Sequence, residues 1–134
     1  MPRGTQAKLP ATLPTPAQAR ATLANARRTF AEKRELVDGL ERRLKTSREL
    51  CRKLEADLDT AETDLLDADE GSAADLEAQA RHLKALQSLD REERSRDEQA
   101  ANLPYVKAEL AQAAATLRGA RGDLRAIGEG RRVR

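Results

Sequence analysis

Residues 36–58, LVDGLERRLKTSRELCRKLEADL, decide the fold, because apolar side chains recur in them at alternating intervals of three and four residues. This spacing returns side chains to one face of an α-helix, and a long run of it is typical of a coiled coil. The run extends in both directions and predicts one long helix. Its a positions are Leu23, Phe30, Val37, Leu44, Cys51, Leu58 and Leu65, and its d positions are Ala19, Ala26, Lys33, Leu40, Ser47, Leu54, Ala61 and Ala68.

Start and stop signals bound this helix. Thr15 and Gln18 have the spacing of a capping box, and Pro16 between them suits the first helical position. At the other end, Gly71 suits the left-handed residue after a helix, and Ser72 with Asp75 has the spacing of a new capping motif. We therefore expect a helix over 16–69 and a second helix from 73.

A second apolar register begins with Leu76, Ala80 and Leu83, is interrupted by a charged stretch, and then becomes strict. The strict run is Leu103, Val106, Leu110, Ala113, Leu117, Ala120, Leu124 and Ile127, three residues out of phase with the first run. A single parallel coiled coil would need a stutter or stammer at that point. A hairpin that turns at 71–72 needs neither, and we prefer it.

Pro104 interrupts the returning arm, because proline disfavours the helix interior and restricts the residue before it. We expect helices over 73–101 and 103–127, with Gly39 level with Pro104, where a bend would bring the backbones close. The predicted fold is all-α: a long antiparallel helical hairpin over 16–127 with a Pro break in the returning arm. An extended, proline-containing arm over 1–15 precedes it, and a basic Gly/Arg tail over 128–134 follows.

Composition agrees with long helices. The chain has 134 residues, of which 36% are charged, and its aromatic residues are Phe30 and Tyr105 alone. A compact α/β or all-β core needs more large rings than this. The single cysteine cannot form an internal disulfide, and neither a membrane span nor a secretory signal is recognisable. We expect a cytoplasmic protein or a component assembled into a virus particle, with no membrane partner.

Charge is segregated along the chain. Residues 54–80 hold ten acids and no base, whereas residues 1–31 hold five bases and no acid. A hairpin would place an acidic tip at the turn, formed by Asp59, Glu62, Asp64, Asp67, Asp69 and Glu70. It would bring together a basic end, formed by Arg3, Lys8, Arg118, Arg121, Arg125, Arg131, Arg132 and Arg134. The acidic tip is either a surface for a basic partner or a simply solvated helix end.

The middle of the hairpin points to a partner chain. Residues 90–99, DREERSRDEQ, offer no apolar side chain to the first helix, and Leu36 and Leu50 at position g widen its apolar stripe. We expect helices of another chain to cover this stripe, unless the midsection is simply exposed. The candidate partner-binding residues are Leu36, Leu44, Leu50, Cys51 and Leu54.

Catalysis and metal binding have little support. His82 and Cys51 are single and lie several helical turns apart in the hairpin, so they cannot form a nucleophile–base pair. Asp67 and Asp69 lie too close to Gly71 for the spacing of an EF-hand loop. We expect no catalytic residue, no metal site and no cofactor.

These features favour a non-enzymatic structural or assembly protein, a coiled-coil rod in a large multi-subunit complex such as a virus or phage particle. Its arm and basic end would anchor it, either in a homo-oligomer or among other subunits. One alternative is an adaptor or chaperone that presents the acidic tip to a basic client. Another is non-specific nucleic-acid binding through the basic termini, although no aromatic side chain interleaves with the arginines to stack on a base.

Overall fold

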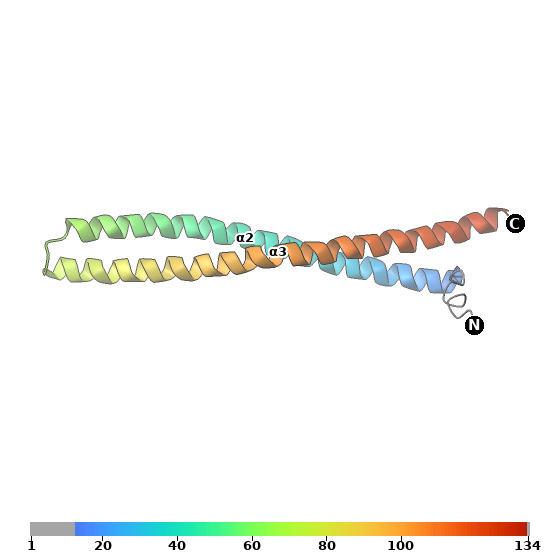
Figure 1. Cartoon of the computed structure of the whole chain (residues 1–134), viewed down its shortest axis with the longest axis horizontal. Coiled ribbons are helices and arrows are strands. Elements are labelled where there is room, and N and C mark those ends of the chain that lie inside the picture. The colour runs from blue at the N-terminus through green and yellow to red at the C-terminus, as the bar shows by residue number, and fades with distance from the viewer. Residues whose placement is uncertain (1–12, 134) are drawn as a thin grey trace, which may run out of the picture. The chain divides into compact units, whose positions relative to one another are not determined.

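The computed structural model describes residues 13–133, which form two long helices joined by a short turn (Figure 1). Helix α2 spans Pro16–Asp67 and helix α3 spans Ala73–Val133. The predicted helical hairpin is confirmed, and the described residues contain no strand. Residues 1–12, which hold most of the predicted arm, lie outside the described residues, as does Arg134.

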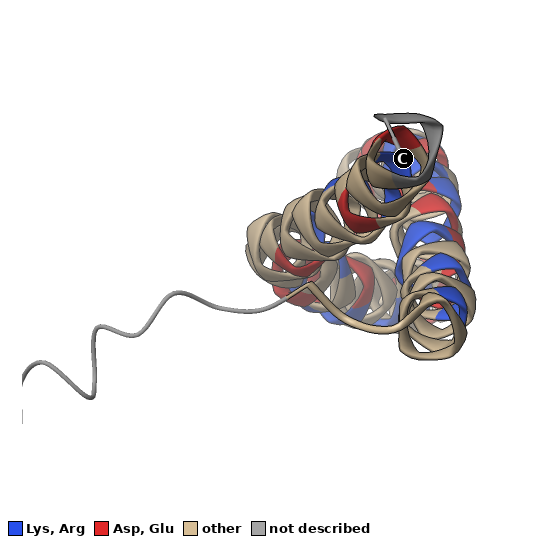
Figure 2. Cartoon of the chain, turned by 90° about the vertical axis from the view of Figure 1, so that its right-hand side faces the viewer, with Lys and Arg blue, Asp and Glu red and all other residues tan. Residues whose placement is uncertain are grey.

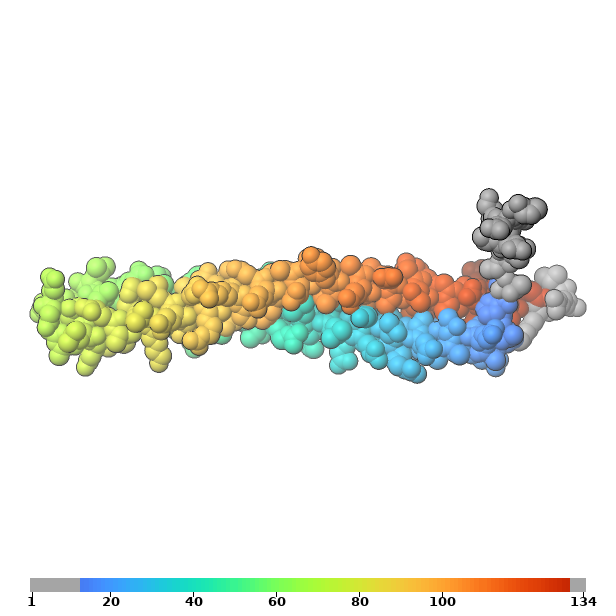
Figure 3. All heavy atoms as spheres, turned by 60° about the horizontal axis from the view of Figure 1, so that its bottom comes forward, coloured from blue at the N-terminus to red at the C-terminus, as the bar shows by residue number. Residues whose placement is uncertain are grey.

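The chain divides into two compact units, and both helices contribute to each. The first unit comprises Met1–Arg34 and Glu109–Arg134, and the second unit is Glu35–Ala108, which includes the turn. Within each unit, the segments of α2 and α3 pack side by side and run antiparallel (Figures 1 and 3).

The face of α2 that packs on α3, which we call the α2 seam, follows the predicted heptad along its whole length. None of the predicted a and d positions from Ala19 to Ala68 is exposed. In the first unit, Ala26 packs in a buried cluster with Leu117 and Ala120 of α3, and Leu23 and Phe30 pack against this cluster. Burial of this one face is the main source of stability of such a helix, because isolated helices in water are marginal.

The α3 seam differs from the prediction near the turn. Its positions keep an unbroken alternation of three and four residues, and none of them is exposed: Asp75, Ala78, His82, Ala85, Leu89, Glu92, Arg96, Gln99, Leu103, Val106, Leu110, Ala113, Leu117, Ala120, Leu124 and Ile127. The predicted register through Leu76, Ala80 and Leu83 is wrong, because these three side chains are exposed. The strict C-terminal register sets the face of the whole helix, and it passes through the charged stretch without a shift.

Helix α3 also continues through Pro104, so the predicted break into 73–101 and 103–127 is wrong as a helix boundary. Proline removes the N–H that would bond to the carbonyl of Ala100. Pro104 is exposed, whereas Leu103 and Val106 on either side of it remain in the seam. Packing of these neighbours holds the helix together despite the missing bond. The helix also extends to Val133, so most of the predicted tail over 128–134 is helical in its backbone.

The predicted capping signals are confirmed at both helix starts. The Thr15 amide donates to Gln18 Oε1 at 3.0 Å, and the Gln18 amide donates to Thr15 Oγ1 at 3.2 Å. In the turn, the Asp75 amide donates to Ser72 Oγ at 3.1 Å, and the Gly71 amide donates to Asp75 Oδ2 at 2.9 Å. Gly71 has a φ of 80°, the left-handed conformation that reverses the chain after α2.

Gly39 does not have the close contact that its predicted place beside Pro104 suggested. A Cβ atom added at Gly39 would meet no heavy atom within 4 Å. The residue lies inside α2, where glycine lowers helix stability relative to alanine because it loses more backbone freedom on folding. Nothing in the packing therefore requires glycine at this position.

The two glycines give opposite predictions. Gly39→Ala is expected to raise the free energy of unfolding by about 0.5–1 kcal/mol. Gly71→Ala is expected to lower it by about 1–2 kcal/mol, because a side chain is strained at positive φ. Thermal unfolding followed by circular dichroism checks both variants. A shift of the same sign in the two would contradict the conformations described.

Pro104→Ala is expected to stabilise the protein, by up to about 3 kcal/mol, because it restores the N–H and removes the clash of the ring with the preceding turn. Urea unfolding followed by circular dichroism measures the change. Tyr105→Ala is the matched control, because Tyr105 is the exposed neighbour of Pro104 in the same helix. Equal stability of Pro104→Ala and the wild type would show that the ring makes a compensating contact.

Candidate interaction surfaces

A polar section interrupts the apolar seam of the second unit. Ser47, a buried d residue of α2, donates its hydroxyl hydrogen to Glu92 Oε1 of α3 at 2.7 Å. The next α3 seam positions are Arg96 and Gln99, and Gln99 Oε1 is buried without a hydrogen-bond partner. A partly satisfied polar group in a seam costs stability relative to an apolar one, and it also restricts which residues can face each other.

Cys51 packs in this section. Its side chain is only 2% exposed. Burial raises the pKa of the Cys51 thiol, and the nearby positive charge of Arg96 opposes this effect in part. The thiol therefore stays protonated around neutral pH and behaves as a small apolar residue, as the sequence predicts for an a position.

The predicted partner-binding residues divide into two groups. Leu44 and Cys51 are buried, at 3% and 2% exposed, so the expectation that another chain covers them does not hold. The α3 seam in this region consists of the long side chains of Glu92, Arg96 and Gln99, whose stems can cover apolar neighbours while their polar ends reach water. Leu54 is half-buried. Leu36 and Leu50 are 53% and 39% exposed and remain candidates.

The acidic tip has the predicted exposure. Asp59, Glu62, Asp64, Asp67, Asp69 and Glu70 are all exposed in the second unit. The burial of Asp75 was not predicted; its carboxylate accepts hydrogen bonds from the Gly71 amide at 2.9 Å and from Gln79 Nε2 at 3.1 Å. Across residues 13–130, no three His, Cys, Asp or Glu side chains are grouped as metal ligands.

The predicted basic end is described in part. Arg118, Arg121 and Arg125 are exposed in the first unit, and Arg125 Nε donates to Glu129 Oε1 at 2.9 Å. Figure 2 marks the basic and acidic residues along both helices in blue and red. Three further predicted residues lie outside the described residues: Arg3, Lys8 and Arg134. The remaining two, Arg131 and Arg132, continue the backbone of α3.

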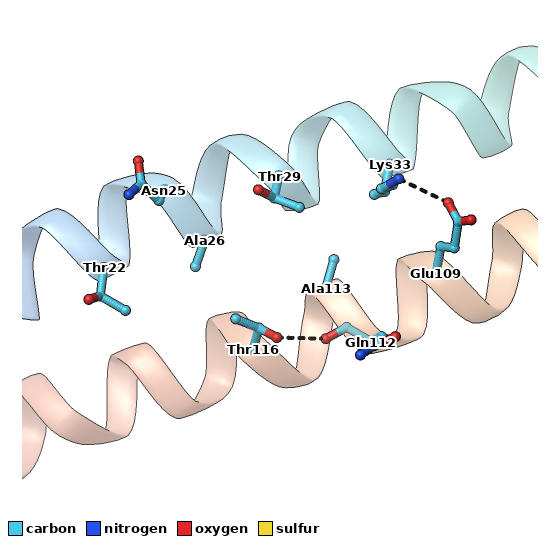
Figure 4. A pocket seen from close by; sticks show the side chains of 9 residues that line it. All are labelled: Thr22, Asn25, Ala26, Thr29, Lys33, Glu109, Gln112, Ala113 and Thr116. Carbon is cyan, nitrogen blue, oxygen red and sulfur yellow. Dashed lines mark hydrogen bonds and ion pairs between the residues drawn. The ribbon is translucent and has the colours of Figure 1, made fainter.

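A groove of about 490 Å³ runs beside the seam of the first unit (Figure 4). Ala26 and Ala113 face each other across it, and Lys33 Nζ donates to Glu109 Oε2 at 2.9 Å at one end. Small seam residues leave this space, because two alanines do not fill the distance between two helices. The other lining residues are Thr22, Asn25, Thr29, Gln112 and Thr116, and they are polar.

Each unit has two distinct sides, which follow from the heptad positions. We number the heptad of α3 with Leu103 at position a. The groove of the first unit is then lined by c, d and g positions of both helices, and no b or e position lines it. In the second unit, a different groove is lined by a, b and e positions only, including Arg52 and Glu55 of α2 and Asp97 and Ala100 of α3. Positions b and e of the two helices therefore share one side of each unit, which we call the b/e side, and positions c and g share the other.

Four large apolar side chains that the sequence did not identify as surface residues lie on the b/e side of the second unit. Leu66, Leu76, Leu83 and Leu86 are 84%, 64%, 56% and 41% exposed. Their exposure could have been predicted from the sequence, because Leu76 and Leu83 do not fall on the a or d positions that the strict C-terminal run of α3 defines. Apolar residues that the hairpin itself leaves exposed are candidates for contact with another molecule.

Comparisons with known proteins do not add a function to this geometry: no protein family, curated protein or solved structure matches the chain. In the part of the chain that the structure describes, neither helix has a stretch long and apolar enough to cross a membrane.

Burial of Cys51 predicts slow thiol chemistry. Only the thiolate reacts, and both the raised pKa and the packing disfavour its formation and attack. Ellman's reagent at mildly alkaline pH is expected to react at least about tenfold more slowly with the folded protein than with the urea-unfolded chain. Equal rates in the two states would show that the seam opens readily around Cys51.

Proposed function

We propose that this protein is a non-enzymatic structural or assembly element, which joins other helices through the outer faces of its hairpin. The observation that supports this most is the set of large leucines outside the seam. Leu36, Leu50, Leu66, Leu76, Leu83 and Leu86 are all exposed, although the two helices already bury one another along an unbroken seam.

The proposal follows from the width of the apolar surface. A two-helix coiled coil needs apolar residues at a and d alone, and helices that pack against further neighbours carry them at flanking positions as well. In this chain the additional leucines occupy positions b, e and g. Helices from copies of the same chain or from other subunits would cover them.

We infer that the setting is a large multi-subunit complex, such as a virus or phage particle. The proline-containing segment over 1–15 supports this setting, because such a segment cannot form a core of its own and is suited to lie along a neighbouring subunit. The exposed arginines near the end of α3 would add to the anchorage.

Sedimentation velocity over a wide concentration range tests the proposal. The wild-type protein is expected to form a species larger than the monomer. Replacing all six exposed leucines by glutamine is expected to raise the dissociation constant by more than about tenfold, because burial of one leucine is worth about 1.5–3 kcal/mol.

One control variant, Tyr105→Gln, changes an exposed apolar residue outside this set and outside the segment over 1–15. It is expected to associate like the wild type. A wild-type protein that stays monomeric at every concentration would contradict self-assembly, and equal association of the six-leucine variant and the wild type would contradict the role of these leucines.

A further inference from the structure

Over residues 17–34 and 111–128, the b/e side of the first unit is lined by arginine and small residues only. Its b and e positions are Ala17, Arg20, Ala24, Arg27, Ala31 and Arg34 in α2, and Ala111, Ala114, Arg118, Arg121, Arg125 and Gly128 in α3. All six arginines are exposed. The acids of the described part of this unit lie elsewhere, with Glu32, Glu109 and Asp123 at c or g and Glu129 at f. We call this surface the arginine face.

The b/e side of the second unit near the turn has the opposite charge. Its b and e positions over 55–66 and 76–97 contain six acids, four leucines and one glutamine, with no basic residue. The acids are Glu55, Asp59, Glu62, Asp90, Glu93 and Asp97, and the leucines are Leu66, Leu76, Leu83 and Leu86. We call this surface the acidic leucine face.

We propose that the acidic leucine face of one copy docks on the arginine face of a second copy of this chain. The inference rests on the proposed function, and it names both the partner and the two surfaces that meet.

Complementary charge is the first argument. Six acids on one face match six arginines on the other. Five of the arginines take part in no ion pair among the described residues, and Arg125 pairs with Glu129 alone. Glu55 and Asp59 likewise have no such pair. Opposed charges of this kind steer association and exclude wrong registers.

Some acids of the acidic leucine face are already paired within their own helix. Asp90 pairs with Arg94 at 3.0 Å, and Asp97 pairs with Arg96 at 3.1 Å. The carboxylates of Asp90 and Asp97 are exposed, and ion pairs at the surface contribute little to stability, so exchanging them for contacts with a second copy costs little. Glu62 is 3.9 Å from His82 Nε2, which is also a weak contact.

Shape is the second argument. In α2 the arginine face alternates arginine with alanine, and in α3 two alanines precede its three arginines and a glycine follows them, so small residues leave room beside the arginine side chains. The opposite face supplies four exposed leucines, which are of a size to enter such spaces and pack along the arginine stems. At about 1.5 Å per residue, the arginine face extends over roughly 25 Å of each helix, and the acidic leucine face extends over roughly 17 Å of α2 and roughly 32 Å of α3.

A second copy fits these observations better than nucleic acid does. Phosphates would neutralise the arginines, but they would leave the acidic leucine face unexplained and its leucines uncovered. The arginine face also has no aromatic side chain on which a base could stack. A single contact between two copies covers the arginine face of one and the acidic leucine face of the other.

A charge exchange in trans tests the docking. Variant A carries Arg20→Glu, Arg27→Glu and Arg34→Glu, and variant B carries Glu55→Arg, Asp59→Arg and Glu62→Arg. In each variant alone, one face is left with three arginines and three acids and so has no net charge to match the unaltered face, and self-association is expected to weaken on the order of 100-fold. In an equal mixture, the unaltered acidic leucine face of variant A meets the unaltered arginine face of variant B, so association is expected to return. Sedimentation velocity and native mass spectrometry identify the mixed species.

Matched controls separate this contact from general effects of charge and leucine content. A variant with Arg28→Glu, Arg42→Glu and Arg43→Glu changes the net charge as variant A does, but at f and g positions, and it is expected to associate like the wild type.

A variant with Leu76→Gln and Leu83→Gln keeps every charge and is expected to weaken self-association by more than about tenfold. Leu36→Gln with Leu50→Gln, on the c/g side, is expected to have a smaller effect. Circular dichroism confirms that each variant stays helical.

Several outcomes would overturn the proposal. If the wild type associates and the mixture of A and B does not, the faces are wrong while the assembly function stands. A wild-type protein that stays monomeric would contradict both the docking of the two faces and the proposed assembly function. If variant A loses salt-dependent binding to random duplex DNA but associates like the wild type, the arginine face serves nucleic acid instead.

Discussion

Everything else in this structure depends on the contact between two helical faces whose residues keep one seven-residue period. The period is unbroken from Ala19 to Leu65 in α2 and from Asp75 to Ile127 in α3. A single missing or extra residue in either helix would rotate every later side chain by about 100° and expose the seam beyond it. The same period determines which residues lie outside the seam and on which of the two outer sides each of them lies.

The seam tolerates residues that local preference disfavours. Gly39, Pro104 and the polar section lie within or beside the seam, and the helices continue through them. The polar section consists of Ser47, Glu92, Arg96 and Gln99. Each such position lowers stability by an amount that a few well-packed apolar neighbours offset. The bond between Ser47 and Glu92 adds a directional contact to a seam that is otherwise non-directional, and such a contact favours one alignment of the two helices over its neighbours.

The α2 heptad, both capping motifs and the turn at Gly71 could be predicted from the sequence, because each depends on residues close together in the chain. The path of α3 through Pro104 could not, because tertiary packing there outweighs a local preference. The face of α3 near the turn was misassigned for a related reason. Leu76 and Leu83 are more apolar than His82 and Ala85, but the longer, stricter run further along the helix decides the orientation. The burial of Cys51 beside Arg96 could not be predicted by counting apolar residues, because such a count ignores the stems of long polar side chains.

The position of the turn also determines the order in which contacts can form. Ser47 and Glu92 are 45 residues apart in sequence, whereas Lys33 and Glu109 are 76 residues apart. Closing the longer loop first would cost more chain entropy than closing the shorter one, so pairing is favoured to begin at the turn and to advance one heptad at a time. Release of the same contacts begins at the pairs most distant in sequence. The first unit is therefore the last to form and the first to open, and the arginine face exists only once the whole hairpin has closed.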